Sequence, residues 1–368
     1  MKSTLITGGA GFIGANYVRR RLQSGDSKVV VLDALTYAGN GASLEGLDDE
    51  RLTFVHGDIR DSDLVERLLR EWECDCVIHF AAESHVDRSI SGPDAFIQTN
   101  VNGTHALLLA AKRVWLAGEG RPHRFHHVST DEVYGTLGPG DHPFRETNQY
   151  EPNSPYSASK AGSDHLVRAY HHTYGLEVTT TNCSNNYGPY QFPEKLIPLM
   201  IVNILLGRNL PVYGDGMQIR DWLYVDDHCA AIDLALERGV SGEVYNIGGD
   251  NERPNIEIVK RICEAVEVRF AKDGELKSRF PEGPISRGGA AEDLITYVED
   301  RPGHDRRYAI DFSKAKRDLG YEPTWDFDQG LAATIDWYLQ MEPWWRAVMD
   351  GTYRDWLELN YAGRSGRG

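Results

Sequence analysis

The sequence predicts an α/β fold in which a doubly wound parallel sheet is followed by a smaller C-terminal lobe. Three observations predict it. Strand-like runs alternate with helix-like periods through the first half, a glycine-rich turn follows the first strand, and prolines and glycines become frequent after Ser184. Strands that alternate with helices pair in parallel through right-handed crossovers, which places helices on both faces of one sheet.

The expected elements follow from apolar periodicity, read in chain order. Alternating or continuous apolar runs indicate strands, and a period near 3.6 residues indicates helices. The strands are 3–7, 28–32, 52–56, 76–80, 124–129 and 177–183, and the helices are 12–24, 64–71, 95–116 and 156–174. After residue 184 the helical pieces shorten, but 224–236 and 243–247 again resemble elements of the first half.

These elements divide the chain into two parts. Residues 1–184 are predicted to form the first domain, of the Rossmann type, to which 223–249 return. Residues 185–222 and 250–345 are predicted to form the second lobe, in which the polar, glycine-rich segment 272–292 is a surface excursion. Residues 362–368 are expected to be a disordered tail.

Composition excludes several classes of function. With 368 residues, 41% hydrophobic and 26% charged, the chain has the make-up of a globular protein. A formal net charge of -16 argues against nucleic-acid binding, although a few arginines in a cleft could still bind a phosphorylated ligand. No apolar run approaches the roughly 18 residues that span a bilayer. The five cysteines lack zinc-ligand spacing, so we expect reduced thiols, a cytoplasmic location and no metal.

A glycine turn between the first strand and the first helix predicts a dinucleotide site. Gly8, Gly11 and Gly14 are spaced GxxGxxG, with Phe12 and Ile13 between the last two, instead of the simpler GxGxxG. Glycines allow a tight turn and let backbone N–H groups approach a pyrophosphate at the N-terminus of a helix. In this context the turn predicts a bound cofactor.

The second and third strands indicate which cofactor. Asp33 ends the second strand at the separation expected of a carboxylate that bonds the ribose hydroxyls. It would repel a 2′-phosphate, and Ala34 and Leu35 offer no cation, so we predict NAD over NADP. Asp58 and Ile59, after the third strand, could bound the adenine, while the alternative for Asp58 is a helix cap.

Tyr156 and Lys160 are the first candidate catalytic residues. They are four residues apart on a predicted helix and therefore share one face. A nearby ammonium would lower the pKa of the phenol, so that a tyrosinate could act as a base near neutral pH. The same lysine could hold the nicotinamide ribose.

Adjacent carboxylates, Asp131 and Glu132, follow the strand that ends near Ser129. They lie at the carboxyl edge of the predicted sheet, where open α/β folds bind their ligands. Two such groups without a local cation would be costly to bury for structure alone. They suit an elimination, in which a base takes a proton next to a ketone and an acid protonates the departing oxygen.

Longer stretches carry a family resemblance: TGGAGFIG, DALTYAGN, GDIRD, HFAAESHVDRSI, VSTDEVYG, NSPYSASKAGSDHLVRAYHHTYGL, CSNNYGPYQFPEKLIP, YGDG, RDWLYVDDH, YNIGG and RPGHDRRYAID. They run from residue 4 to about residue 345. The chain resembles the extended short-chain dehydrogenase/reductase family and, within it, the dTDP-glucose 4,6-dehydratases. The resemblance implies a lyase that converts dTDP-glucose into dTDP-4-keto-6-deoxyglucose for deoxysugar biosynthesis, with tightly held NAD that is regenerated in each turnover.

The resemblance also implies a role for each catalytic residue. Tyr156 removes the proton of the glucose 4-hydroxyl while the C4 hydride passes to NAD; Thr130 bonds the same oxygen and Lys160 supports Tyr156. Glu132 abstracts the C5 proton and Asp131 protonates the 6-hydroxyl as water leaves. The hydride then returns to C6.

Binding residues are carried over in the same way. Ala81 joins the cofactor set. The cleft between cofactor and sugar is lined by Glu83, Ser84 and His85. The diphosphate is held by Asn185, Lys195, Leu196, Arg220, Arg301 and His304. The nucleobase side is contacted by Tyr213 and Asn255. The resemblance further implies a homodimer in which helices 95–116 and 156–174 pair across a two-fold axis.

Two departures and two alternatives stay open. Asn182 stands where family members usually carry a basic residue, and the loop 40–46 departs from the commoner pattern. The alternatives are an NAD-dependent nucleotide-sugar 4-epimerase or decarboxylase, against which the Asp131–Glu132 pair argues, and a catalytically silent NAD-sensing protein, which would be expected to lose these groups. Thymidine is favoured by the resemblance, uridine is the other choice, and the product could feed cell-envelope rhamnose or specialised deoxysugars.

Overall fold

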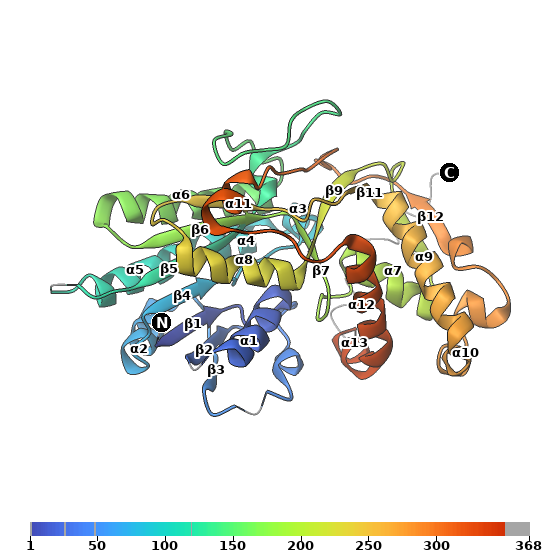
Figure 1. Ribbon diagram of the computed structural model, residues 1–368, viewed down its shortest axis with the longest axis horizontal. Helices are drawn as coiled ribbons and strands as arrows, with labels where there is room; N and C mark the ends of the chain where they lie inside the picture. Colours follow the sequence, from blue (N-terminus) through green and yellow to red (C-terminus); the bar gives the residue numbers. More distant parts are fainter. Residues whose placement is uncertain (1, 26, 48, 119, 350–368) are drawn as a thin grey trace.

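The computed structural model describes residues 2–25, 27–47, 49–118 and 120–349. Its larger part is a seven-stranded sheet with strand order β10-β6-β5-β4-β1-β2-β3 (Figure 1). Every neighbouring pair in this sheet is parallel, so the predicted fold class is confirmed. The strands are β1 (Ser3–Thr7), β2 (Lys28–Asp33), β3 (Leu52–His56), β4 (Cys76–His79), β5 (Arg124–Thr130), β6 (Val178–Cys183) and β10 (Val244–Ile247).

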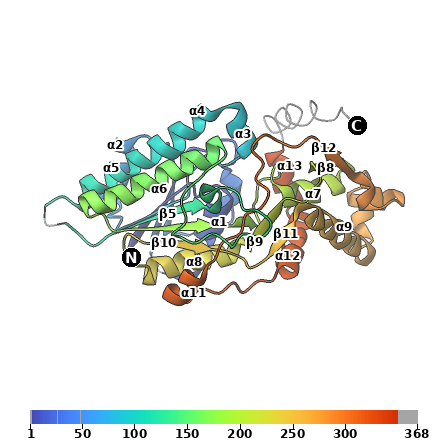
Figure 2. The same cartoon turned by 90° about the horizontal axis from the view of Figure 1, so that it is seen from above.

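Helices cover both faces of this sheet (Figure 2). One layer consists of α2 (Ser62–Glu71), α5 (Thr104–Trp115) and α6 (Pro155–Tyr174), and the other of α1 (Phe12–Ser24) and α8 (Val225–Arg238). Burial on both sides explains the continuous apolar runs, such as Val29–Leu32 in β2, whose side chains are all buried. The strand order reverses between β1 and β4, which creates the crevice where such sheets bind ligands.

The predicted helix 95–116 is not one regular α-helix. The structure has α3 (Val86–Ser91), α4 (Pro93–Phe96), a π-helix η2 (Ile97–Gly103) and then α5. Within the π-helix, the Asn100 side chain bonds the backbone of Glu83 in both directions, at 2.9 Å each, and a Cβ on Gly103 would lie 2.5 Å from Ile59 Cδ1. A widened turn satisfies both contacts, and periodicity alone could not predict it.

The second part of the molecule has its own core. It is built on α7 (Leu196–Leu205), α9 (Asn255–Lys272) and α12 (Phe327–Gln340), whose apolar side chains form one large buried cluster. Two small sheets lie beside it, β11 (Glu252–Pro254)-β9 (Ile219–Tyr224)-β7 (Asn185–Tyr187) and β12 (Ile295–Val298)-β8 (Leu210–Tyr213). The shorter helices are α10 (Glu275–Arg279), α11 (Ser313–Leu319), α13 (Glu342–Val348), η1 (Gly41–Leu44), η3 (Asp131–Tyr134), η4 (Pro284–Arg287) and η5 (Ala291–Leu294).

β10 pairs with β6 in the large sheet and α8 packs on α1, so both elements lie with the first part of the molecule, where residues 223–249 were expected. Other segments depart from the expected division. Helix α11, from the stretch assigned to the lobe, packs on α8 and β10 through Ala315 and Leu319. The expected surface excursion 272–292 is anchored in the lobe core by the buried Leu276 and Phe280. The expected tail 362–368 lies outside the described residues, and in the ranges that are described no helix is long and apolar enough to cross a membrane.

Candidate active site

The glycine turn between β1 and α1 has no room for side chains. Gly8 has a φ of +70°, and a Cβ there would lie 2.6 Å from the backbone nitrogen of Ala81. A Cβ on Gly14 would lie 2.2 Å from the carbonyl oxygen of Gly8. The turn therefore packs directly against the backbone that follows β4 and against the start of α1. The outer side of its backbone is left for a ligand.

The N-terminus of α1 is suited to an anion. Its cap residue, Gly11, has no side chain to cover the first N–H groups, and the first turn, which contains Phe12 and Ile13, carries no acidic residue. The first N–H groups of a helix have no partner within the helix, so they attract a phosphate or pyrophosphate.

Asp33 closes this site at the end of β2. Its carboxylate is buried and accepts hydrogen bonds from the backbone nitrogens of Ala10, at 2.9 Å, and Leu35, at 2.8 Å. Burial raises its pKa, while these two bonds act in the opposite direction. The carboxylate thus faces the glycine turn in a fixed orientation. Together with the glycines, it fits the diphosphate and ribose of a dinucleotide.

Asp58 and Ile59 lie at the far end of this region. Asp58 pairs with Arg60 at 2.6 Å, which lowers the pKa of the Asp58 carboxyl. The cap of α2 is instead Asp61, whose side chain accepts from the nitrogen of Leu64, so the alternative of Asp58 as a helix cap is wrong. Ile59 is buried in the core under α5, so it could contribute to a cofactor site only by closing one side of it with an apolar side chain.

The catalytic edge is formed where β5 ends and α6 begins. Ser154 and Ser157 form a capping box that fixes the start of α6. Tyr156 lies in that first turn, and Thr130, the last residue of β5, hydrogen-bonds its hydroxyl. Lys160 follows one turn later, and its Nζ donates to the carbonyl oxygen of Val128 at 2.9 Å. The structure therefore brings the predicted Thr130, Tyr156 and Lys160 together.

The expected lowering of the Tyr156 pKa is wrong for this geometry. Burial raises the pKa of Tyr156 well above its usual value, and the nearby Glu132 raises it further. The Lys160 ammonium donates to the carbonyl oxygen of Val128, and its charge is not among the main influences on the pKa of the phenol. Spacing on the helix predicted the proximity of the two residues but not the direction in which the ammonium points.

The two carboxylates after β5 lie in different surroundings. Burial raises the pKa of Asp131 well above its usual value, and Glu132 and Asp221 raise it further, while its Oδ2 has no hydrogen-bond partner among the described residues. Burial also raises the pKa of Glu132, but Arg301, Arg220 and Lys195 oppose this effect by their charge. Asp131 is thus set up to stay protonated, and Glu132 is the more readily ionised of the two.

A cleft between the two parts of the molecule contains the predicted substrate residues, but Glu83, which was also expected there, is not part of its lining. The cleft is lined by Glu132 and by all ten residues predicted for the substrate, which are Ser84, His85, Asn185, Lys195, Leu196, Tyr213, Arg220, Asn255, Arg301 and His304. The side-chain oxygens of Asn185 and Asn255 are buried without a hydrogen-bond partner in the part of the chain that is described. Such orphaned acceptors indicate a place for a ligand's donors.

The sequence did not single out several other residues that line the cleft, among them Asp87, Glu194 and Trp222. Asp87 accepts from Arg301 and from the Tyr213 hydroxyl, both at 3.1 Å, and the Arg301 charge is the main influence that lowers its pKa. Glu194 accepts from Arg88 at 3.2 Å. Both residues stand inside quoted motifs, next to predicted ones, and that adjacency was the available signal.

The glycine turn follows β1, where the strand order reverses, and the Tyr156–Lys160 pair lies on α6, after β5. This is the arrangement of short-chain dehydrogenase/reductase enzymes. Sequence comparison places the chain more narrowly. It belongs to the family described as GDP-mannose 4,6 dehydratase, which matches residues 5–334.

Similar proteins narrow the likeness further. The chain is 58% identical over 360 residues to a dTDP-glucose 4,6-dehydratase of Xanthomonas campestris, covering 96% of this chain and 98% of the relative. The crystal structure of the dTDP-glucose 4,6-dehydratase DesIV of Streptomyces venezuelae, with NAD bound, is 47% identical, with a TM-score of 0.84 over 94% of this chain and 99% of that one. A UDP-glucose 4-epimerase of Thermotoga maritima is 28% identical, with a TM-score of 0.78 over 92% and 99%.

Proposed function

We propose that this chain is an NAD-dependent lyase that dehydrates dTDP-glucose to dTDP-4-keto-6-deoxyglucose for deoxysugar biosynthesis. The observation that carries the proposal is the Asp131–Glu132 pair beside Tyr156, in which Asp131 is buried and Glu132 is half-buried at the cleft. A 4-epimerase needs only the oxidation at C4, for which Tyr156 suffices. An acid and a base held side by side are needed when a proton leaves C5 and a hydroxyl leaves C6.

The environments of the two carboxyls assign their roles. Asp131 has its pKa raised by burial and by the neighbouring carboxylates, so it carries the proton that the departing 6-hydroxyl needs. Glu132 faces Arg301, Arg220 and Lys195, whose charges favour its ionised form, so it takes the C5 proton. The 6-hydroxyl leaves with the proton of Asp131 as water, and Glu132 returns a proton to C5 when the hydride adds to C6, so the product keeps its C5 hydrogen.

The first step, the oxidation at C4, uses the other residues of the catalytic edge, Tyr156, Thr130 and Lys160. Tyr156 accepts the proton of the 4-hydroxyl, and Thr130 holds the phenol in place by a hydrogen bond. Because burial raises the pKa of the phenol, this transfer needs a positive charge beside it, which the nicotinamide ring of bound NAD would provide. Gly8, Gly11, Gly14 and Asp33 would hold NAD, which would accept the hydride of C4 and later give it to C6. Lys160, anchored to Val128, would reach the nicotinamide ribose from its place below Tyr156.

The cleft supports a nucleoside-diphosphate sugar as substrate. Arg220 is buried, and Arg301 keeps only 18% of its side chain exposed, so both present charge that is poorly screened by water. Phosphate oxygens are the natural partners of such guanidinium groups. Tyr213 and Asn255 lie at the same cleft and would bound the nucleobase, for which thymine is our choice.

The first experiment is a product assay with dTDP-glucose and no added cofactor, following the alkali-induced absorbance of the 4-keto-6-deoxy sugar. A signal supports both the dehydration and a tightly held NAD. Silence with added NAD, and with every glucose nucleotide tried, overturns the proposal. Formation of the C4 epimer without dehydration would favour the epimerase.

We further propose that the chain acts as a homodimer in the cytoplasm. The helical layer of η2, α5 and α6 carries the exposed Ile97, and Ile90 on the adjoining α3 is also exposed, which suits an apolar pairing surface. The five cysteines are unpaired and buried, as expected in a reducing compartment. A single species of monomer mass in ultracentrifugation at micromolar concentration would rule out the dimer.

A further inference from the structure

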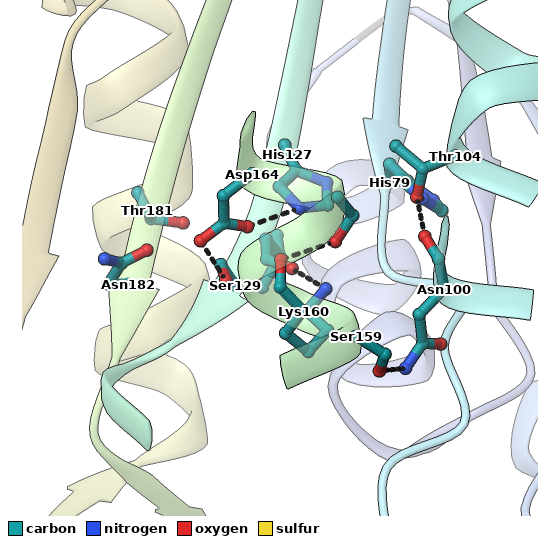
Figure 3. Close-up of polar contacts among 12 residues, drawn as sticks. His79, Asn100, Thr104, His127, Ser129, Ser159, Lys160, Asp164, Thr181 and Asn182 are labelled. Carbon is teal, nitrogen blue, oxygen red and sulfur yellow. Dashed lines mark hydrogen bonds and ion pairs between the residues drawn. The ribbon is translucent and has the colours of Figure 1, made fainter. Parts of the chain in front are cut away.

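Asp164 is a buried carboxylate that none of the steps above uses. It lies on α6, four residues after Lys160 and eight after Tyr156, so the three residues follow one face of the helix. The side chain faces β5, as Figure 3 shows, and does not line the substrate cleft. A carboxylate buried behind a catalytic helix requires a physical reason, because burial of a charge is unfavourable.

Neutral donors hold the two oxygens of this carboxylate. His127 Nε2 lies 3.0 Å from Oδ1, and the hydroxyl of Ser129 donates to Oδ2 at 2.9 Å (Figure 3). The hydroxyl of Tyr150 makes a further bond. Burial lowers the pKa of His127 well below its usual value, so its ring is uncharged. Both β5 residues directly precede the catalytic end of the strand, which ties that end to α6.

The other groups around Asp164 leave Lys160 as its main charged neighbour. On β4, His79 is held neutral by burial, and the phenol of Tyr134 has its pKa raised to a value at which it stays protonated. Asn182 on β6 is uncharged. On α6 itself, the charge of Lys160 acts on Asp164 most strongly among the neighbouring cations, ahead of His165.

Lys160 depends on Asp164 in return. Its side chain is buried, and that burial lowers its pKa. The carboxylate of Asp164 is the leading influence in the opposite direction, ahead of the thiol of Cys183. Because the ammonium donates to the Val128 carbonyl, Asp164 acts on it through charge in a region of low dielectric constant.

We propose that Asp164 is a positioning residue, whose carboxylate supplies the counter-charge that holds the Lys160 ammonium at the catalytic edge. The inference rests on the proposed role of the Tyr156–Lys160 pair. Asp164 touches neither substrate nor cofactor in this arrangement. Its effect passes through Lys160 and through the alignment of β5 with α6.

The decisive test is the titration of Lys160 in protein labelled with ¹³C at the lysine Cε, its signal identified by its loss in Lys160→Arg. In Asp164→Asn the titration midpoint of Lys160 should move to lower pH than in the wild type. The matched control is Ser129→Ala, which removes a hydrogen bond to Asp164 but keeps its charge, and its midpoint should stay near the wild-type value. If Asp164→Asn does not fold, Asp164→Ser replaces it.

Kinetics provide the second readout. With Lys160 unsupported, kcat should fall by about 10- to 100-fold, the usual consequence of slight misplacement of a catalytic group, while KM changes little. Burial raises the pKa of Asp164 to about 6, so the wild type should lose part of its kcat as the pH falls through that value. Asp164→Asn should lack this part of the loss while it keeps the acid limb set by the ionisation of Glu132. An unchanged Lys160 midpoint overturns the inference. That titration needs no substrate, so it decides the inference even if dTDP-glucose proves not to be the substrate.

Discussion

The catalytic edge and the substrate cleft are built in opposite ways. The edge, defined here as Thr130–Glu132 and Tyr156–Lys160, comes from the end of one strand and the start of one helix. The cleft is lined by residues from Ser84 to His304, which belong to both parts of the molecule. Local sequence can specify the edge, but the cleft exists only when the lobe is packed against the sheet. Chemistry and recognition are therefore encoded at different ranges along the chain.

Glu132 belongs to both regions. It follows Asp131 at the edge, yet it lines the cleft and faces the charges of Arg301, Arg220 and Lys195. If the comparison holds, edge variants should lower kcat and cleft variants should raise KM, and Glu132 should report on both.

The largest effect is expected for Glu132→Gln, which keeps the shape of the side chain but removes the base. Oxidation at C4 should continue, so reduced nicotinamide should build up on adding substrate, while product formation stops. Exchange of the C5 hydrogen with deuterium from the solvent should also stop. The matched control is Asp131→Asn, which should retain the exchange because it removes only the acid. Full turnover by Glu132→Gln would contradict the assignment.

Tyr156→Phe should suppress the first step itself. Loss of a general base lowers the rate by roughly 10²–10⁴-fold. Neither product nor reduced nicotinamide should appear at the wild-type rate, and KM should stay close to that of the wild type because the ring remains in place. A loss of kcat smaller than tenfold would show that another group accepts the 4-hydroxyl proton.

The contrast between the regions also explains what the sequence could predict. The alternation of strands and helices specified the sheet, and the glycine turn, Asp33, and the Tyr156–Lys160 spacing specified one edge of it. The residues that line the cleft are scattered along the chain and share no local pattern, so they could be predicted only from the family resemblance. The π-helix at Asn100 and the anchoring of 272–292 by Phe280 depend on tertiary contacts, so periodicity could not predict them.

Directions of side chains were the harder part. Spacing placed Lys160 beside Tyr156, but only the structure shows that the ammonium bonds Val128, and so that burial controls the pKa of the phenol. In the same way, Asp87 is a plain carboxylate in sequence, and its place between Arg301 and Tyr213 arises from segments that are far apart in the chain.

Arg301→Met should separate binding from chemistry. Loss of a charged hydrogen bond to a phosphate should raise KM by about 10- to 100-fold. Arg301 also opposes the raising of the Glu132 pKa. Without it that pKa should rise further, and the acid limb of the kcat profile should move to higher pH, because Glu132 acts when ionised. Arg301→Lys, which keeps the charge, should leave the limb nearly in place; an unmoved limb in Arg301→Met would mean that this charge does not reach Glu132.

The smallest effect is expected for Tyr213→Phe, which probes the cleft far from the reacting carbons. The change removes the hydroxyl that donates to Asp87 Oδ2 but keeps the aromatic face that would lie against the nucleobase. One neutral donor to a buried carboxylate corresponds to a change of roughly 2- to 10-fold in KM. Asp87 would keep its partner Arg301, so the cations around Glu132 should not shift and kcat with its pH profile should stay as in the wild type. Initial rates over a range of dTDP-glucose concentrations test this. A fall in kcat that exceeds the rise in KM would show that the cleft and the catalytic edge are mechanically coupled through Asp87, and that the separation of recognition from chemistry fails at that residue.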